Sequence, residues 1–138
     1  LYNKTEVNDM DYLTWEERCR MYPVRFNVLD DCKTGAFDMA RVHPLKQREV
    51  LKIYNVLNGV DEVESVVIFG SALSMKCNIE SDLDLVITVT STCTDIQRNN
   101  IDILIQEATD WDCDILWGDH IDSTDRIYED VERGLKLI

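Results

Sequence analysis

The stretch that decides the fold runs from residue 66 to residue 89 and reads VVIFGSALSMKCNIESDLDLVITV. Two apolar runs flank a polar loop: the first ends at Gly70-Ser71, and the second opens with Asp82 and Asp84 at alternate positions. Apolar runs of this length that are rich in β-branched residues predict two buried strands. Because strand interiors usually avoid Asp, the two carboxylates need a separate explanation.

Alternation along the second strand gives that explanation. Side chains of a strand point to opposite faces in turn, so Asp82 and Asp84 share one face. The opposite face is expected to enter the core and carries Leu83, Leu85 and Ile87. Two close carboxylates repel each other and lose hydration when buried, so a cation would compensate them. Mg²⁺ suits such a site, because it typically takes one or two carboxylates together with substrate phosphates.

A third apolar run, CDILW at residues 113–117, repeats the pattern. Asp112 and Asp114 share one face of this predicted strand, whereas the other face carries Cys113, Ile115 and Trp117. Asp114 lies inside the run, which makes it the better candidate for a third metal-facing acid. Asp112 stands at the strand entrance, where we expect it to be solvated.

The Gly-Ser pair is a candidate phosphate site. Gly70 allows a sharp turn or a close backbone approach, and Ser71 adds a hydroxyl. A helical turn over residues 72–76 would direct free N–H groups at an anion. Either motif alone is usually an ordinary turn or strand end. Together with Asp82 and Asp84 they indicate a nucleoside triphosphate site for phosphoryl or nucleotidyl transfer, in which metal ions neutralise the phosphates and activate a hydroxyl.

Periodicity and turn residues predict the other elements of a domain over residues 44–138. They are a helix from Pro44 to about Gly59, a strand at 64–70, a helix at 95–111, a strand at 113–117, a helix at 123–134 with Ser123 or Asp122 as N-cap and Gly134 as its stop, and a last short strand at 135–138. The helix near Pro44 has an apolar stripe that includes Leu45. This order predicts an α+β (α/β) fold with a small mixed β-sheet flanked by helices.

Residues 1–43 have a different character and are expected to form an N-terminal helical and loop extension. A helix is predicted to end before Pro23, and residues 27–38 read as a loop or short hairpin. The aromatic residues of this part, for which core packing is favoured over an interface, are Tyr12, Trp15 and Tyr22.

Composition limits the function. The 138 residues fit one domain of ordinary size, and their net charge is −13, with 14 basic and 27 acidic residues. Direct nucleic-acid binding is disfavoured because it needs clustered Lys and Arg. The excess of acidic residues is explained most simply as a means of keeping the protein soluble. A more specific interpretation is that it binds a basic partner protein or a divalent metal.

The cysteine pattern and the chain start bear on location. The five cysteines form no C-x-x-C pair, which favours free thiols in the cytoplasm. No long apolar run predicts a membrane helix, and no signal peptide is evident. The chain opens on Leu1 rather than Met, so we expect that a short leader preceded it.

The combination of FGS, ten further residues, DLD and a later CDI resembles the nucleotidyltransferase superfamily with the DNA polymerase β-like palm. The small size is most similar to the minimal nucleotidyltransferases of bacteria and archaea. The terminal DRIYEDVERGLKLI is similar to the helix and strand that close those domains. The resemblance covers about residues 45–138 and not the first 43.

The resemblance implies a polymerase β-like fold and a set of roles. Gly70 and Ser71 would hold the triphosphate, Asp82 and Asp84 would bind two Mg²⁺ ions, and Asp114 would complete the metal site and serve as base. Such enzymes transfer a nucleoside monophosphate, here expected to be AMP from ATP, to a hydroxyl of a protein or small molecule and release pyrophosphate. Some minimal members are antitoxins that modify a HEPN-type toxin.

One departure from the family pattern leaves alternatives open. Many minimal members read G-S-R-A-R-G, but here Ala72 and Ser74 replace the arginines, and Lys76 is the remaining candidate for a phosphate-binding cation. A non-catalytic or weakly active palm-fold binding module, such as an antitoxin covering a HEPN-type toxin, is therefore the alternative function. A metal-dependent phosphatase is weaker still. No nucleophile elbow, Walker loop or kinase signature is evident.

Overall fold

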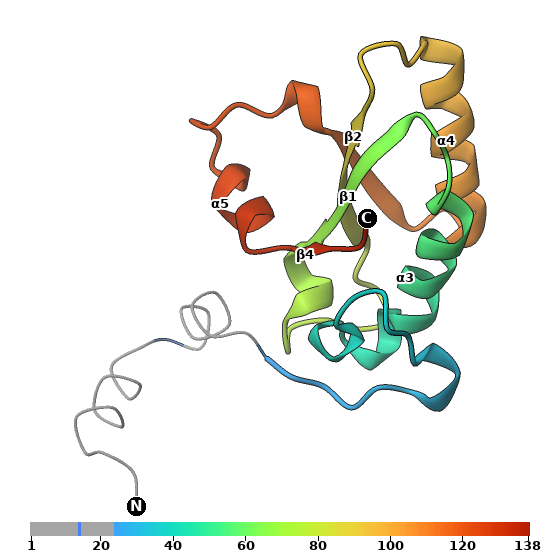
Figure 1. The fold of residues 1–138 in the computed structure, drawn as a ribbon. Helices are drawn as coiled ribbons and strands as arrows, with labels where there is room; N and C mark the ends of the chain where they lie inside the picture. Colours follow the sequence, from blue (N-terminus) through green and yellow to red (C-terminus); the bar gives the residue numbers. More distant parts are fainter. Residues whose placement is uncertain (1–13, 15–23) are drawn as a thin grey trace, which may run out of the picture.

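The computed structural model describes residue 14 and residues 24–138 (Figure 1). The described elements, in chain order, are η1 (Asp30–Cys32), η2 (Met39–Arg41), α3 (Pro44–Leu57), β1 (Val63–Phe69), η3 (Gly70–Leu73), β2 (Leu83–Val89), α4 (Asp95–Ala108), β3 (Cys113–Trp117), η4 (Gly118–His120), α5 (Ile127–Glu132) and β4 (Leu135–Lys136). Here η marks a 3₁₀-helix. The expected α+β class is confirmed.

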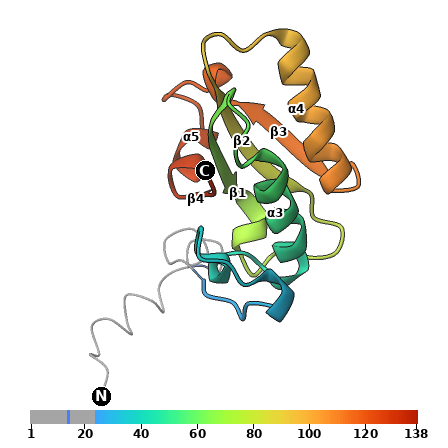
Figure 2. The same ribbon diagram turned by 45° about the vertical axis from the view of Figure 1, so that its right-hand side comes forward.

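The strands form one mixed sheet in the order β3-β2-β1-β4. β1 is antiparallel to β2 and to β4, whereas β2 and β3 are parallel. α3 and α4 lie side by side against one face of the sheet, and α5 lies on its other side (Figures 1 and 2). The parallel pair is possible because α4 provides the crossover between β2 and β3.

The core lies between the sheet and the two long helices. The predicted inward residues of β2, Leu83, Leu85 and Ile87, are fully buried there. α3 begins where Pro44 fills the first helical position and the Nδ1 atom of His43 accepts a hydrogen bond from the Leu45 N–H at 3.1 Å. Among the described residues, none of the helices has the length and apolar character that a membrane span requires.

The stripe of α3 differs from the prediction at its start. Leu45 is 47% exposed, whereas Lys46 and Gln47 are buried in its place. Lys46 stands four residues before the buried Val50, so it takes the inward position of the first turn. Apolar character alone therefore misplaced the first position of the stripe, whereas Val50, Ile53 and Leu57 are buried as predicted.

α4 ends earlier than predicted. It ends at Ala108 rather than at residue 111, although it begins with a capping box between Thr94 and Gln97. The Thr109 hydroxyl donates to the Ile105 carbonyl at 2.9 Å, and the next two residues take positive φ angles, Asp110 at 50° and Trp111 at 67°. A left-handed pair cannot continue a right-handed helix, so the chain turns there into β3.

α5 is also shorter than predicted, and neither predicted N-cap is used. The Asp122 side chain accepts from the Thr124 N–H at 3.1 Å, and the Asp122 N–H donates to the Asp125 side chain at 2.9 Å. These local bonds build a turn in place of the first helical turn. The helix starts at Ile127, and the side chain of its N-cap residue, Arg126, makes no capping hydrogen bond.

The described part of the N-terminal region, residues 24–43, shares the core of the domain. Cys32, Met39 and Val42 are buried in the same apolar cluster as the sheet and α3. In place of a hairpin, residues 27–38 contain η1 and turns. The predicted helix before Pro23 lies outside the described residues, as do Tyr12, Trp15 and Tyr22.

Candidate active site

Asp84 stands at the centre of a row that crosses three strands. It is the register partner of Phe69 on antiparallel β1 and of Asp114 on parallel β3. Neighbouring strands lie about 4.8 Å apart, so the two carboxylates start from adjacent backbone positions. Phe69 is the last residue of β1, which brings Gly70 to the same end of the sheet.

The acids face away from the helices that cover the core. Leu83 and Cys113 are buried on the helix side, so their neighbours along each strand project to the opposite side. There Asp84 is half-buried, whereas Asp82 and Asp114 are exposed. The alternation that the sequence predicted for both strands is thus present.

Gly70 lies directly against Asp84. Its φ angle is +79°, a conformation that side chains rarely adopt. A Cβ atom added there would lie 2.6 Å from the Asp84 Oδ2 atom. Gly70 therefore has both a conformational and a steric reason to lack a side chain.

The electrostatics of the row are dominated by negative charge. Burial, and then the charges of Asp114 and Asp82, raise the pKa of Asp84 to about 6, and no basic group within the described residues contributes to this shift. The Cys113 thiol behind the row also has a raised pKa, first through burial and then through the charges of Asp114 and Asp84. A raised thiol pKa makes Cys113 a poor nucleophile, which leaves the carboxylates as the candidate reactive groups of this site.

The fit of a metal ion follows from the donor set. Carboxylate oxygens are ligands that Mg²⁺ prefers, and a cation would relieve the repulsion that raises the Asp84 pKa. Within residue 14 and residues 24–138, however, no three or more His, Cys, Asp or Glu side chains are already gathered closely enough to hold a metal. The fold thus places the acids at adjacent backbone positions. From these positions the exposed side chains of Asp82 and Asp114 can rotate toward a shared metal ion.

The predicted phosphate site lies in the loop between β1 and β2. The helical turn expected over residues 72–76 is instead the 3₁₀-helix η3, which begins at Gly70 and ends at Leu73, and Ser74 is already extended. The Ser71 carbonyl accepts from the Ser74 N–H at 2.9 Å, and the Lys76 N–H donates to the Ser74 Oγ atom at 3.1 Å. Lys76 is exposed and is not among the groups that shift the Asp84 pKa. The structure brings Gly70 to the carboxylates and leaves Ser71 and Lys76 in the adjoining loop.

The rest of this loop is held by its own side chains. The Asn78 N–H donates to the Ser81 Oγ atom at 3.0 Å, and the Glu80 N–H donates to the Asn78 Oδ1 atom at 2.9 Å. An open groove of about 590 Å³ separates the loop from the start of α3, and it is lined by His43, Leu45, Cys77, Asn78, Ile79 and Glu80. None of the three predicted metal ligands lines it.

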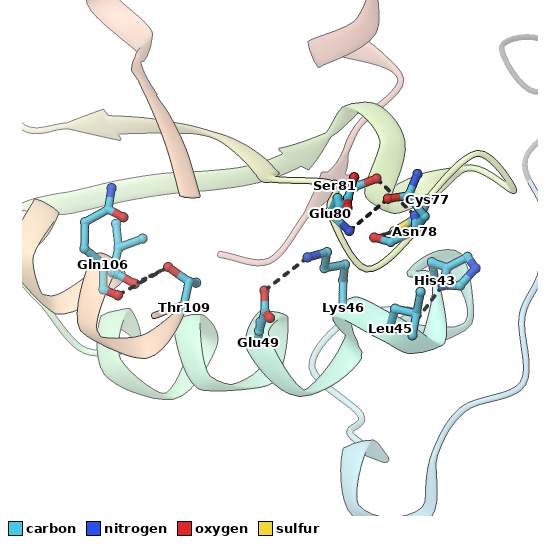
Figure 3. A network of polar contacts seen from close by, with 11 residues as sticks. His43, Leu45, Lys46, Glu49, Cys77, Asn78, Glu80, Ser81, Gln106 and Thr109 are labelled. Carbon is cyan, nitrogen blue, oxygen red and sulfur yellow. Dashed lines mark hydrogen bonds and ion pairs between the residues drawn. The ribbon is translucent and has the colours of Figure 1, made fainter. Parts of the chain in front are cut away.

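One buried ion pair was not predicted. The Lys46 Nζ atom lies 3.9 Å from the Glu49 Oε2 atom, and Lys46 is 4% exposed (Figure 3). Burial raises the pKa of Glu49, Lys46 lowers it, and Asp112 and Asp110 raise it further. The negative charges of the segment that leads into β3 therefore act on this pair. Its signal in the sequence was spacing, because Lys46 occupies the helical position four residues before Val50.

Comparisons with known proteins agree with this geometry. A family model described as Polymerase beta, Nucleotidyltransferase matches residues 51–134. The matched part contains the loop after β1 and all three acids of the predicted site. A search of curated proteins finds no match. The mixed sheet and its helices have the polymerase β-like arrangement that the residue pattern predicted, and the chain belongs to this nucleotidyltransferase family.

Proposed function

We propose that the protein is a Mg²⁺-dependent nucleotidyltransferase that transfers AMP from ATP to a hydroxyl of a protein or small molecule and releases pyrophosphate. The observation that carries the proposal is the pairing of Asp84 and Asp114 on adjacent strands, with Gly70 directly against the Asp84 side chain. Carboxylates that start from neighbouring positions on an open face suit a metal-assisted transfer in which substrates must reach the reacting atoms.

The three acids divide into two metal ligands and one residue that is both a ligand and a base. Asp82 and Asp84 would hold two Mg²⁺ ions, which when bound neutralise phosphate charge and lower the pKa of the attacking hydroxyl. Asp114, which is exposed, would complete the metal site and accept the hydroxyl proton. The acceptor oxygen bonds to the α-phosphorus while the bond to the β-phosphate oxygen breaks, so pyrophosphate leaves. Ser71 and Lys76 are the proposed phosphate contacts.

Radiolabel transfer tests the proposal. The purified protein is incubated with each α-labelled nucleoside triphosphate, Mg²⁺ and candidate acceptors, which include a cell extract. We expect label on an acceptor with ATP, and a loss of at least about 100-fold in Asp84→Asn because a metal ligand is removed. Asp112→Asn is the matched control, since Asp112 is an exposed acid just outside the row. The proposal fails if no nucleotide gives transfer and none binds in a metal-dependent way.

A binding module is the second candidate function. It is favoured by Ala72 and Ser74, which stand where many minimal members of the family carry arginines, and by the lack of a basic contribution to the Asp84 pKa from the described part of the chain. Such a module would cover a partner, for example a HEPN-type toxin. The Asp82→Asn/Asp84→Asn double variant separates the two functions, because a binding module would keep its cellular activity and an enzyme would lose it.

We propose a cytoplasmic location on the state of the cysteines. The four cysteines within residues 24–138 are all free thiols, and three of them are buried. Free thiols persist in a reducing compartment and tend to be oxidised outside it.

A further inference from the structure

We propose that Gly70 is a positioning residue for Asp84, whose carboxylate occupies the space that a side chain at residue 70 would fill. This inference rests on the proposed function, since it concerns the same metal-binding row. Gly70 was expected to contact phosphate. Here its role is to leave the space in which the Asp84 carboxylate, a proposed metal ligand, is held.

Three contacts support this assignment. A Cβ atom on Gly70 would lie 2.6 Å from the Asp84 Oδ2 atom, 3.5 Å from its Cγ atom and 3.6 Å from its Cβ atom. The whole Asp84 side chain therefore stands over the Cα atom of Gly70. Cβ contacts below 3.0 Å essentially do not occur, so either the carboxylate or the backbone must move if the side chain is added.

The backbone is the part that is fixed. Phe69 and Asp84 are register partners at the end of a regular ladder that pairs β1 with β2 from Ser65 and Thr88 onward. Its hydrogen bonds fix the distance between Gly70 and Asp84, so the carboxylate is the group that must rotate. Asp84 would then leave the position at which it faces Asp114, and the two acids could no longer share one ion with the same geometry.

A second glycine provides a matched control. Gly59, in the turn after α3, also has a positive φ angle, +91°, but no atom lies within 4 Å of its missing Cβ. Alanine at Gly59 therefore tests the conformational strain alone. Alanine at Gly70 tests the same strain together with the contact to Asp84.

The experiment is a double-mutant cycle on the full chain without metal. Urea denaturation midpoints are measured for the wild type, Gly70→Ala, Gly59→Ala, Asp84→Ala and the Gly70→Ala/Asp84→Ala double variant. We expect Gly70→Ala to lower the midpoint more than Gly59→Ala, and the excess to disappear once Asp84 is truncated. Equal effects of the two glycine substitutions, or an excess that persists without the Asp84 carboxylate, would overturn the inference.

Metal binding provides the functional readout. Calorimetric titration with Mn²⁺ is expected to show at least about a tenfold weaker affinity for Gly70→Ala and an unchanged affinity for Gly59→Ala, because a residue that orients a metal ligand typically affects affinity by that much. Unchanged Mn²⁺ affinity in Gly70→Ala would contradict the positioning role. If the wild type binds no Mn²⁺, the proposed function fails, and the stability cycle still decides whether Gly70 and Asp84 are coupled.

Discussion

Asp84 on β2 and Asp114 on β3 are direct register partners in a parallel pair of strands. Their placement follows from two separate sequence features, an Asp-Leu-Asp strand start and an Asp inside a later apolar run. The crossover through α4 brings these features together from positions 30 residues apart in sequence numbering. The strand pairing holds these two carboxylates next to each other although their charges repel. The predictions for Asp84 and for divalent cations depend on this arrangement.

The metal-free protein should be stabilised by Asp84→Asn at neutral pH. The folded pKa of Asp84, about 6, lies above the ordinary aspartate value of 3.8, so the folded state binds the proton more tightly. Its contribution therefore makes the protein less stable as pH rises from about 4 to 6. Discounted for solvent screening, the gain from Asn is about 1 kcal/mol at pH 8.

Urea denaturation in EDTA at pH 8 and pH 4.5 measures this effect. The gain from Asp84→Asn should shrink at the lower pH, because the wild-type carboxyl is then mostly protonated in the folded state. Asp112→Asn should show no comparable gain. A stabilisation that is equal at both pH values would show that the effect does not come from the charge of Asp84.

Divalent cations should stabilise the wild type through the carboxylate row. A ligand at 100 times its Kd adds about 2.7 kcal/mol when it binds only the folded state. Thermal denaturation with Mg²⁺ or Mn²⁺ should therefore raise the Tm of the wild type, and the Asp82→Asn/Asp84→Asn variant should not respond. High NaCl is the control for ionic strength. The same rise in Tm in the double variant would place the cation elsewhere.

Gln47→Leu should destabilise the domain by about 2 to 4 kcal/mol. The buried Gln47 amide accepts from the Leu29 N–H at 2.8 Å and donates to the Asn27 and Val42 carbonyls at 2.9 and 3.0 Å. Leucine fills a similar volume and leaves these backbone groups without partners, each at a cost of about 1 kcal/mol or more.

Arg48→Ala is the control for the Gln47 prediction. Arg48 also links α3 to the N-terminal region, through Asp31 at 2.8 Å, but its side chain is 62% exposed. Exposed ion pairs contribute little, so a loss below about 1 kcal/mol is expected. Urea denaturation of both variants tests the comparison, and losses of equal size would argue against Gln47 as the main anchor.

Lys46→Met should cost more stability than the Lys46→Met/Glu49→Gln double variant. The single substitution removes the ion-pair partner of the partly buried Glu49 carboxylate, whose pKa is raised by burial and then by the charges of Asp112 and Asp110, and a cost of about 2 kcal/mol is expected for such a group. The second substitution removes that charge. The loss in Lys46→Met should also diminish as the pH falls, because the raised pKa of Glu49 favours uptake of a proton that removes the uncompensated charge. Additive effects of the two substitutions in urea denaturation would contradict this interpretation.

The strands were predictable from sequence because each has a strong local pattern. Leu83 and Leu85 alternate with Asp82 and Asp84, and this alternation predicted both the buried face and the face of the site. Asp114 could be chosen over Asp112 for the same reason, since it lies within the apolar run. Only the register, which makes Asp84 and Asp114 partners, required the structure.

The parts that were mispredicted depend on side chains that compete with regular structure. The bonds between Asp122 and Asp125 replace the first turn expected for α5, and the Thr109 hydroxyl helps to end α4 early. Lys46 and Gln47 are buried polar residues, which a search for apolar stripes passes over. The contact of Gly70 with Asp84 joins two strands, so no local pattern reports it.

The most direct test of the central claim is to identify what ATP releases in the presence of Mg²⁺ and an acceptor. We predict pyrophosphate, with the α-phosphate label bound covalently to the acceptor in equal amount, and loss of both products in Asp84→Asn but not in Asp112→Asn. Release of orthophosphate without a labelled acceptor would contradict the account, as would label transfer that Asp84→Asn leaves unchanged.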